Sequence, residues 1–359
     1  MITISLCMIV RNEEAVLGRC LDSVQGIPDE VIIVDTGSQD QTREIAARYT
    51  DRIYDFPWID DFAAARNFAF SKATKEYLLW LDADDILKPT EREKFLALKE
   101  TLPIETDMVM MPYQIAEDDA GRATFSYFRE RLMKRACGYQ WQGAVHEAVT
   151  PSGRIRYEPI AITHRKVSPG DPDRNLKIFE KLLAEKKELV PREWYYYARE
   201  LWYHRRYAEA EQKFLHFLSM GGWKEDRMEA WLILSQCQIA QGNRTAALQS
   251  LYQSFMEGIP RAEICCAIGD WYREEERYPE AIYWYETART VPDHAEGFQR
   301  PDMKDFIPLM QLCVCYDRTG DHEKARQCHL LAKRQKPEHP SVLYNEAYFN
   351  RLEQTPSLQ

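Results

Sequence analysis

The sequence lacks the features that mark membrane-spanning, nucleic-acid-binding and secreted proteins. No apolar segment reaches the roughly 20 residues that a membrane-spanning helix needs, so we expect no membrane span. No block rich in lysine and arginine occurs and the formal net charge is −10, which argues against nucleic acid as the main partner. The apolar N-terminus, Met1–Val10, has neither a basic leader nor a small-residue cleavage site. We therefore expect a strand there and not a signal peptide.

Cysteine pairs of the kind found in disulfide frameworks and zinc sites are also missing. The nine cysteines include no Cys-x-x-Cys pair, and the closest spacings are Cys265-Cys266 and Cys313-x-Cys315. This usage is typical of a reducing compartment, so we expect a cytoplasmic protein. A length of 359 residues, with 45% hydrophobic and 29% charged residues, is typical of a globular protein with two domains.

The first half of the chain alternates strand-like and helix-like segments up to about Lys166. Helical spacing covers residues 16–24, the stretch from Ile45 to Tyr49, Phe62–Ala73 (which Asp60 or Asp61 can cap) and Glu91–Leu102. The predicted strands are Ile2–Val10, Val31–Asp35, Arg52–Phe56, Tyr77–Leu81, Met108–Ile115, Thr124–Lys134, Gln140–Val149 and Arg156–Thr163. Alternation that gives way to consecutive strands predicts a mainly parallel α/β sheet with a mixed, partly antiparallel extension.

A break at Ser168-Pro169-Gly170-Asp171-Pro172 separates this half from a second one without strand signals. We therefore predict one domain over residues 1–168 and another over 169–359. The second half contains a repeat, which becomes visible when four alanines are aligned. The aligned alanines are Ala210, Ala247, Ala281 and Ala325. Twelve positions before each alanine lies a small residue: Ala198, Ser235, Gly269 and Cys313. Four positions after each alanine lies a large residue or His: Phe214, Leu251, Tyr285 and His329.

The aligned alanines are 37, 34 and 44 residues apart. Trp194 and Trp231 hold a further repeat position, and Pro260, Pro292 and Pro337 close repeats. Helix pairs packed small-into-large at this period are the signature of tetratricopeptide repeats, so we predict an all-α solenoid. The long last interval predicts an insertion around Ala295–Asp305, and Val342–Leu352 is expected to be a capping helix.

The most informative segment is Tyr77–Asp85, an apolar run that ends in three carboxylates. Such a run is typical of a central parallel strand, and ligands gather at the carboxyl ends of these strands. Asp82 and Asp84 are two residues apart, so in extended backbone their side chains point the same way. Converging carboxylates favour Mg²⁺ or Mn²⁺ between them. The alternative is an acidic turn in which Asp85 or Thr90 caps a helix that begins near Pro89.

Polar groups follow other predicted strands as well. Val10-Arg11-Asn12-Glu13 and Asp35-Thr36-Gly37-Ser38 are strand-to-helix turns that can hold a nucleotide, although Asn12 and Ser38 could serve only as helix caps. Arg66 lies on an otherwise apolar helix, where it can meet phosphates or extend to the surface. His164 ends the last predicted strand and could add a nitrogen ligand to the same metal, although a lone His is more often structural.

Taken together, these segments resemble the family 2 glycosyltransferases of GT-A fold, a Rossmann-like fold for nucleotide-diphospho-sugar transferases. The resemblance covers about Met1–Lys166, and the motifs that carry it are Cys7–Glu14, Ile33–Ser38, Asp61–Asn67 and Leu81–Asp85. With Gly143–Glu147 and the C-terminal repeats, it narrows to bacterial family 2 enzymes with tetratricopeptide repeats. That group includes a peptide S-glycosyltransferase.

The resemblance implies an inverting transfer from a nucleotide sugar, usually a uridine diphosphate (UDP) sugar, with Mn²⁺ or Mg²⁺. It places Arg11, Glu13 and Asp35 in the nucleoside pocket, beside Val10 and Ala83. Arg66 would meet the pyrophosphate, and Asp82 and Asp84 would hold ribose and metal, with His164 as a further ligand. Asp84 is therefore expected to be catalytic through the metal, although Asp85 could ligate it instead.

Inversion by direct displacement also needs a base opposite the leaving group. We choose Glu147, because it neighbours His146 on a predicted strand facing the cleft; Asp60 or Asp61 is the alternative. Trp141 and His146 are expected to contact the acceptor. The repeats are expected to bind a peptide or protein acceptor in their groove, or instead to pack on the first domain or form a homodimer. Two further readings are a transferase acting on a cell-envelope glycan or lipopolysaccharide, and a repeat scaffold with a decayed transferase domain.

Overall fold

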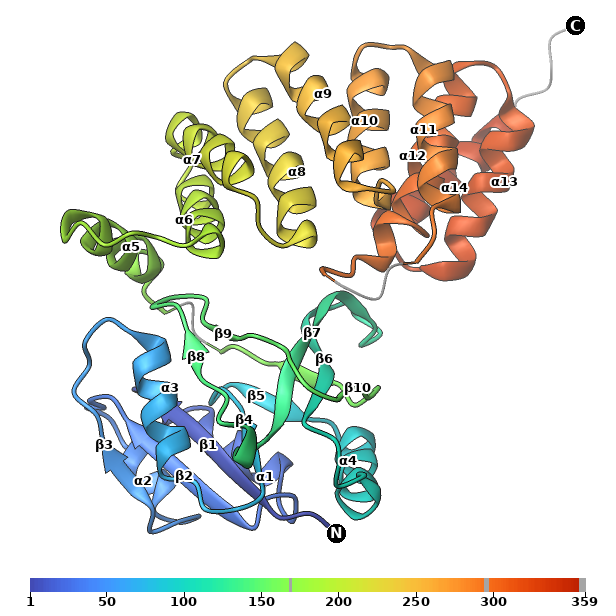
Figure 1. The fold of residues 1–359 in the computed structure, drawn as a ribbon. Coiled ribbons are helices and arrows are strands. Elements are labelled where there is room, and N and C mark those ends of the chain that lie inside the picture. The colour runs from blue at the N-terminus through green and yellow to red at the C-terminus, as the bar shows by residue number, and fades with distance from the viewer. Residues whose placement is uncertain (168–169, 294–296, 355–359) are drawn as a thin grey trace, which may run out of the picture. The chain divides into compact units, whose positions relative to one another are not determined.

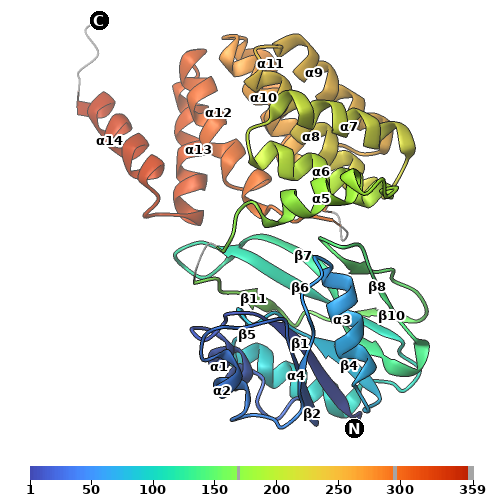
Figure 2. The same cartoon turned by 90° about the vertical axis from the view of Figure 1, so that its left-hand side faces the viewer.

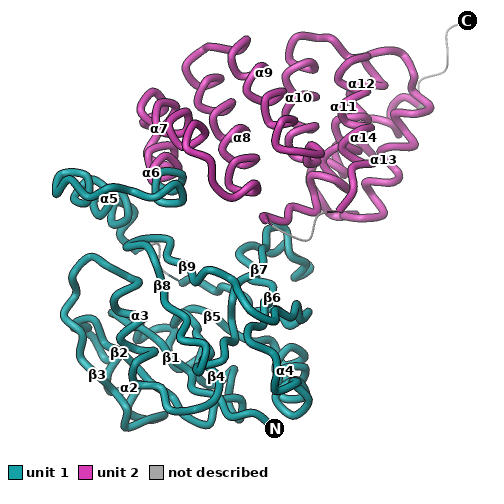
Figure 3. The backbone as a smooth tube through the Cα atoms, viewed as in Figure 1, with its two compact units in different colours: residues 1–196 teal, residues 197–359 magenta. Residues whose placement is uncertain are grey.

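The computed structural model describes residues 1–167, 170–293 and 297–354 (Figure 1). The chain divides into two compact units, Met1–Tyr196 and Tyr197–Gln359 (Figure 3). The predicted boundary, between residues 168 and 169, lies outside the described residues, so it stays a prediction. Within the described ranges, no helix combines the length and the apolar character that crossing a membrane requires.

A single nine-stranded sheet forms the centre of the first unit. Its order is β3-β2-β1-β4-β7-β6-β11-β5, with β10 also paired to β6. The strands β3, β2, β1 and β4 are parallel, and β7 joins β4 antiparallel, which confirms the predicted mixed sheet. The bounds are β1 Ile4–Val10, β2 Glu30–Asp35, β3 Ile53–Asp55, β4 Tyr77–Trp80, β5 Asp85–Leu87, β6 Met108–Glu117, β7 Ala123–Lys134, β10 Ile155–Tyr157 and β11 Ile162–His164.

Helices cover both faces of this sheet, because the central strands are apolar on both sides. In β1, Leu6 and Met8 belong to one buried cluster and Cys7 to the other. Helices α1 (Leu17–Ser23), α2 (Thr42–Ala46) and α4 (Pro89–Thr101) contribute to the first cluster, and α3 (Phe62–Ser71) to the second (Figure 2). This three-layer arrangement brings the carboxyl ends of β1, β2 and β4 to one edge, where ligands bind in open α/β sheets.

Two of the predicted strands are wrong as continuous elements. Residues 140–149 form two short strands, β8 (Trp141–Gln142) and β9 (Ala148–Val149), which pair antiparallel with each other outside the main sheet. The intervening turn needs positive φ at Gly143 (93°) and His146 (52°), which no strand accommodates. The predicted strand at residues 156–163 is likewise divided into β10 and β11, with Pro159, which has no N–H to donate, between them.

The helix caps differ in part from the prediction. Asp61 caps α3 as expected, since its side chain accepts a hydrogen bond of 2.8 Å from the backbone N–H of Ala64. Neither Asp85 nor Thr90 caps α4. Lys88 holds the N-cap position without a side-chain hydrogen bond. Asp85 is unavailable because it lies in β5 and is completely buried.

The second unit consists of helix pairs, as the tetratricopeptide period predicts. Helix α5 (Arg174–Ala184) precedes it in the first unit, and α6 begins in the first unit and ends in the second. The pairs are α6 (Pro191–Tyr203) with α7 (Tyr207–Met220), α8 (Lys224–Ala240) with α9 (Arg244–Gln253), α10 (Ala262–Glu274) with α11 (Tyr278–Thr290) and α12 (Ile307–Arg318) with α13 (His322–Gln335).

Helix α14 (Pro340–Gln354) follows the last pair, where the capping helix is predicted. All four aligned alanines, Ala210, Ala247, Ala281 and Ala325, are completely buried, so small residues fill the helix contacts as the repeat requires. The long last interval corresponds to the residues between α11 and α12, which include a short 3-10 helix at Pro301–Met303. Of the insertion predicted at 295–305, residues 295 and 296 lie outside the described ranges.

Gly269 in α10 tests this packing. A Cβ atom there would lie 2.7 Å from the ring of Tyr285, which is completely buried and donates a 2.6 Å hydrogen bond to Asp270. We expect Gly269→Ala to destabilise the protein by about 1–3 kcal/mol, despite the better helix propensity of alanine. Thermal unfolding checks this, with Gly18→Ala as the matched control.

Gly18 lies in α1 with its nearest atoms at 3.6 Å. There the substitution should leave stability unchanged or raise it by up to about 1 kcal/mol. Equal effects at the two glycines would contradict tight small-into-large packing in the repeats.

Candidate active site

A cavity of about 510 Å³ opens at the carboxyl ends of β1 and β4. It is bounded by strand ends, by α3 and by the turn that joins β8 to β9. Ten residues singled out from the sequence line it: Val10, Arg11, Glu13, Arg66, Asp82, Ala83, Asp84, His146, Glu147 and His164. Segments up to 154 residues apart in the chain therefore meet at one site, if Val10 and His164 are taken as the extremes.

Two other predicted residues lie elsewhere among the described residues. Asp35 is buried beneath the edge, where Gly37, Ser38 and Arg43 donate hydrogen bonds to it. Burial alone would raise the pKa of the Asp35 carboxyl, but these hydrogen bonds hold it below its usual value. The ring centre of Trp141 lies 5.0 Å from the Arg66 guanidinium, and Trp141 lines a separate cavity of about 390 Å³ between α3 and α5.

The loops after β1 and β2 are tied to each other. The N–H of Asn12 donates to Ser38 Oγ at 3.0 Å, and Asn12 Oδ1 accepts from the N–H of Gln39 at 2.8 Å. The interpretation of Asn12 and Ser38 as helix caps is wrong, since Val16 and Gln41 hold the N-cap positions of α1 and α2. The reciprocal pair instead fixes the wall of the cavity that carries Arg11 and Glu13.

Asp82–Asp85 form a tight turn, which corrects the expectation of extended backbone. The N–H of Asp85 donates to the carbonyl of Asp82 at 3.0 Å, and Asp85 Oδ2 accepts from the N–H of Asp82 at 3.1 Å. The side chains of Asp82 and Asp84 consequently take different partners. Asp82 pairs with Arg66 at 2.7 Å, whereas Asp84 lies 3.3 Å from His164 Nδ1.

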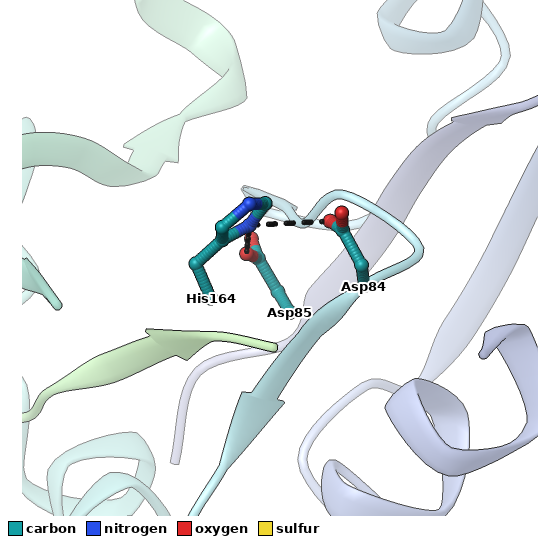
Figure 4. A group of neighbouring side chains, drawn as sticks. All are labelled: Asp84, Asp85 and His164. Carbon is teal, nitrogen blue, oxygen red and sulfur yellow. Dashed lines mark ion pairs between the residues drawn. The ribbon is translucent and has the colours of Figure 1, made fainter. Parts of the chain in front are cut away.

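Asp84, Asp85 and His164 form the candidate metal centre (Figure 4). One ligand atom from each lies within 4.8 Å of the others, and two carboxylates with an imidazole suit Mn²⁺ or Mg²⁺. Asp85 already receives hydrogen bonds from Arg131 at 3.0 Å and Tyr113 at 2.8 Å and is completely buried. Asp84 is partly exposed and lines the cavity, so it is the more available acid for an ion.

Metal binding at this centre is expected to depend on pH through the protonation of His164. Burial alone would lower the pKa of the imidazole, but Asp84 and Asp85 beside it raise the value to about 10. The ring is therefore protonated at neutral pH, and an ion that takes its nitrogen must displace a proton. Tyr113, whose hydroxyl lies 3.0 Å from His164 Nδ1, holds the ring in place.

Arg66 joins the two sides of the cavity. Its Nε donates to Glu147 at 2.6 Å and its Nη2 to Asp82 at 2.7 Å, while its guanidinium lies 4.7 Å from the Trp80 ring centre and 5.0 Å from that of Trp141. Burial would lower the pKa of Arg66, but Asp82 and Glu147 raise it further above its usual value. Burial would likewise raise the pKa of Asp82, but Arg66 and Arg131 lower it to about 2. Both groups are therefore charged at neutral pH.

Glu147 reaches the cavity from a turn and not from a strand. Residues 143–147 connect β8 to β9, and the N–H of Phe62 donates to the carbonyl of Ala144 at 2.9 Å. The ring of His146 stacks on Tyr196 with 4.1 Å between centres and 15° between planes. Arg192 donates a 3.4 Å hydrogen bond to the His146 carbonyl. The prediction that Glu147 lies on a strand facing the cleft is wrong, although Glu147 lines the cavity as expected.

Glu13 lines the cavity near enough to the acidic turn for the charges of Asp82 and Asp84 to act on it. Burial, together with the charges of Asp84, Asp82 and Asp40, raises the pKa of its carboxyl to about 7, against a smaller opposing effect of Arg174. Glu13 therefore exchanges a proton near neutral pH. A cation at the acidic turn would favour the ionised form.

Sequence reasoning missed the aromatic and cationic floor of the site. Trp80, Tyr113, Tyr127 and Arg129 line the cavity. The guanidinium of Arg131 lies 3.8 Å and that of Arg129 4.8 Å from the Trp80 ring centre, and Arg129 also pairs with Glu130. The sequence signal that could have indicated this floor is the charged triplet Arg129-Glu130-Arg131 inside a predicted strand. Charged side chains in a buried strand need partners, so the triplet indicates a buried ion-pair network.

Comparison with known proteins agrees with this geometry. The model of glycosyl transferase family 2 matches residues 5–157, the part of the first unit that contains the acidic turn, Arg66 and Glu147. This part of the chain is a family 2 glycosyltransferase domain. The C-terminal repeats are tetratricopeptide-like by their helix pairs and buried alanines.

Three curated relatives illustrate the similarity. A TPR repeat-containing protein of Synechococcus elongatus is 38% identical over 152 residues, 42% of this chain and 36% of that protein. The lipopolysaccharide core biosynthesis glycosyltransferase LpsC of Rhizobium meliloti is 30% identical over 163 residues, 42% of this chain and 58% of LpsC. The prophage-derived glycosyltransferase SunS of Bacillus subtilis is 28% identical over 221 residues, 55% of this chain and 49% of SunS. The chain thus spans about a third to three fifths of these relatives.

The pKa of His164 yields a prediction for metal binding. Because the raised pKa keeps the ring protonated below about pH 10, each Mn²⁺ bound at pH 7 should release about one proton. Its affinity should therefore rise with pH between 6 and 9. Calorimetric titration in two buffers of different ionisation enthalpy measures the release.

His164→Gln is the control, since glutamine carries no proton to lose. It should bind Mn²⁺ more weakly and release about one proton fewer than the wild type, with any remaining release coming from Glu13. Equal proton release from the wild type and from this variant would remove His164 from the metal centre.

Proposed function

We propose that the protein is an inverting, metal-dependent glycosyltransferase that moves a sugar from a UDP-sugar donor to a side chain of a peptide or protein. The observation that carries this proposal is the convergence of Asp84, His164, Arg66 and Glu147 on one cavity in a family 2 domain. A non-catalytic scaffold would have no use for buried charges held in this arrangement. Their retention favours catalysis over a decayed domain.

The donor diphosphate is proposed to lie over the acidic turn. Asp84 and His164 would hold Mn²⁺ or Mg²⁺, which supplies positive charge to the leaving diphosphate. Arg66 and Arg129 add fixed cationic charge in a buried setting, where it stabilises developing negative charge without reorganisation. Arg11 and Glu13, on the neighbouring wall, are proposed to contact the nucleoside, with Val10 and Ala83 as backbone contacts and Asp35 bracing the wall from below.

Glu147 is the proposed base. It lines the cavity and its side chain is 8–10% exposed, in reach of Arg66. The alternatives have other roles, since Asp61 caps α3 and Asp60 pairs with Lys181 at 2.6 Å. Glu147 is among the residues that line the cavity, whereas Asp60 and Asp61 are not. His146, next to Glu147 in the turn, and Trp141, in β8, are proposed to shape the acceptor entrance.

The acceptor is proposed to bind on the tetratricopeptide unit. Solenoids of helix pairs hold peptides or proteins along an extended face, and the resemblance to bacterial family 2 enzymes with such repeats includes a peptide S-glycosyltransferase. A homodimer formed through the repeats is the alternative use of the same face. The nine cysteines are all free, so we propose that the reaction takes place in the cytoplasm or another reducing compartment.

A cell-envelope acceptor is the second candidate. The relative that favours it is LpsC, which is named for lipopolysaccharide core biosynthesis. The two candidates share the donor site and differ only in what enters opposite the leaving group. A panel of acceptors, assayed for UDP release with peptides and with lipopolysaccharide core oligosaccharides, separates them.

Metal dependence is tested at Asp84. Asp84→Ala should lower kcat for hydrolysis of UDP-glucose in Mn²⁺ by about 10²–10³-fold or more, because the leaving diphosphate loses a stabilising charge. The protein should keep its melting temperature, since Asp84 is partly exposed. Asp51→Ala, at an exposed position of the same unit, is the control and should behave as wild type. Full turnover in chelator, or in the Asp84 variant, would refute a metal-dependent reaction.

The role of Glu147 is tested with Glu147→Gln. If Glu147 is the base, kcat for UDP-glucose hydrolysis should fall by about 10²-fold or more. UDP affinity should change little, because glutamine can still accept a hydrogen bond from Arg66. An equal loss of UDP affinity and kcat would instead make Glu147 a partner that only positions Arg66.

A further inference from the structure

The segment 297–300 is an addition to the repeat architecture. It lies in the interval of 44 residues between Ala281 and Ala325, where the preceding repeats need 34 and 37. Gly297 has a φ of +77°, and a Cβ on it would lie 2.7 Å from Glu225 Oε2. Phe298 is buried (6% exposed), so the segment is pressed onto the helices although the repeat period does not require it.

Arg300 holds this segment on two successive repeats. Its Nη1 and Nη2 donate to both oxygens of Glu229 in α8, at 3.0 and 2.6 Å, and Nη1 also donates to Glu263 in α10 at 3.2 Å. Phe298 lies between cations, with its ring centre 5.3 Å from the guanidinium carbon of Arg199 in α6 and 5.6 Å from that of Arg300. We call the surface formed by Glu229 and Glu263 the acidic face.

The charges of the acidic face call for a guanidinium. Glu229 and Glu263 of the acidic face, and Glu225 near them, are all buried, with 4–8% of each residue exposed. Arg261 pairs with Glu225 and lies 3.7 Å from Glu263, whereas Glu229 is bridged by Arg300. Removing a cation from buried carboxylates is costly, and a planar fork of donors suits two carboxylates better than an ammonium does. Whatever replaces Arg300 must therefore bring a guanidinium.

We propose that the acidic face is the docking site for an arginine of the acceptor peptide, with an aromatic residue two positions before it. Residues 297–300 occupy this site as an internal ligand until such a peptide displaces them. This inference rests on the proposed function only in taking the acceptor to be a peptide. A tethered ligand competes at an effective concentration on the order of millimolar, so the wild type should bind a free peptide weakly and a variant without Arg300 should bind it well.

The experiment uses the full chain and a fluorescein-labelled synthetic peptide that copies residues 297–303, Gly-Phe-Gln-Arg-Pro-Asp-Met. Fluorescence anisotropy should give Arg300→Ala at least a tenfold lower Kd for this peptide than wild type. Adding Glu229→Gln and Glu263→Gln to Arg300→Ala should abolish that gain. A peptide with citrulline in place of arginine should bind at least tenfold more weakly. Arg277→Ala, which removes a surface partner of Glu280, is the control and should match wild type.

Folding is checked by circular dichroism and thermal melting, with Arg300→Lys as a second variant that keeps the charge and loses the two-pronged contact. A folded Arg300→Ala or Arg300→Lys that binds no better than wild type would overturn the proposal. Unfolding of both variants would overturn it too, because the segment would then be a structural tie. UDP-sugar hydrolysis is measured in parallel: peptide binding without turnover refutes the glycosyltransferase alone, and turnover without binding refutes the docking site alone.

Discussion

The site depends on one buried ion pair, Asp85 with Arg131. Both side chains are completely excluded from solvent and lie 3.0 Å apart. Asp85 closes the acidic turn through the N–H of Asp82 and accepts from Tyr113, which in turn contacts His164. Two nitrogens of Arg131 lack a hydrogen-bond partner among the described residues, and the rings of Trp80 and Tyr113 cover the guanidinium at 3.8 and 4.3 Å instead. Breaking such a pair costs about 3–5 kcal/mol, and the loss would reach the turn, the imidazole and the floor because Asp85 and Arg131 contact all three directly or through Tyr113.

The ring of Trp80 contacts three arginines that line or underlie the cavity. The guanidiniums of Arg66, Arg129 and Arg131 all lie within 4.8 Å of its ring centre, and three cations held so close together repel one another. Asp82, Glu130 and Asp85 compensate them one by one. The resulting network of alternating charges is buried, and the guanidiniums of Arg66, Arg131 and Arg129 in it hold the pKa of Asp82 low.

Local patterns in the sequence predicted most of the fold. Apolar runs such as Tyr77–Leu81 and the aligned alanines depend on nearest neighbours, so strands, helices and repeats could be placed from them. The sequence could identify the candidate site residues but not their contacts, because their partners are distant in the chain. Arg66 pairs with Glu147, 81 residues away, and Asp85 pairs with Arg131, 46 residues away. The turn at Asp82–Asp85 is closed by local hydrogen bonds, but the partners that its side chains and the turn at His146 meet are distant in the chain.

The stacking of His146 on Tyr196 has a consequence for how the chain can be divided. Tyr196 and Arg192 belong to α6, whose first residues complete the family 2 unit and whose last residues open the solenoid. The turn that carries Glu147 is therefore braced by a helix that the sequence assigns to the repeats. A gene fragment cut at residue 168 would code for the sheet and yet leave that brace behind. A fragment that is to keep the Glu147 turn in place must therefore extend through α6.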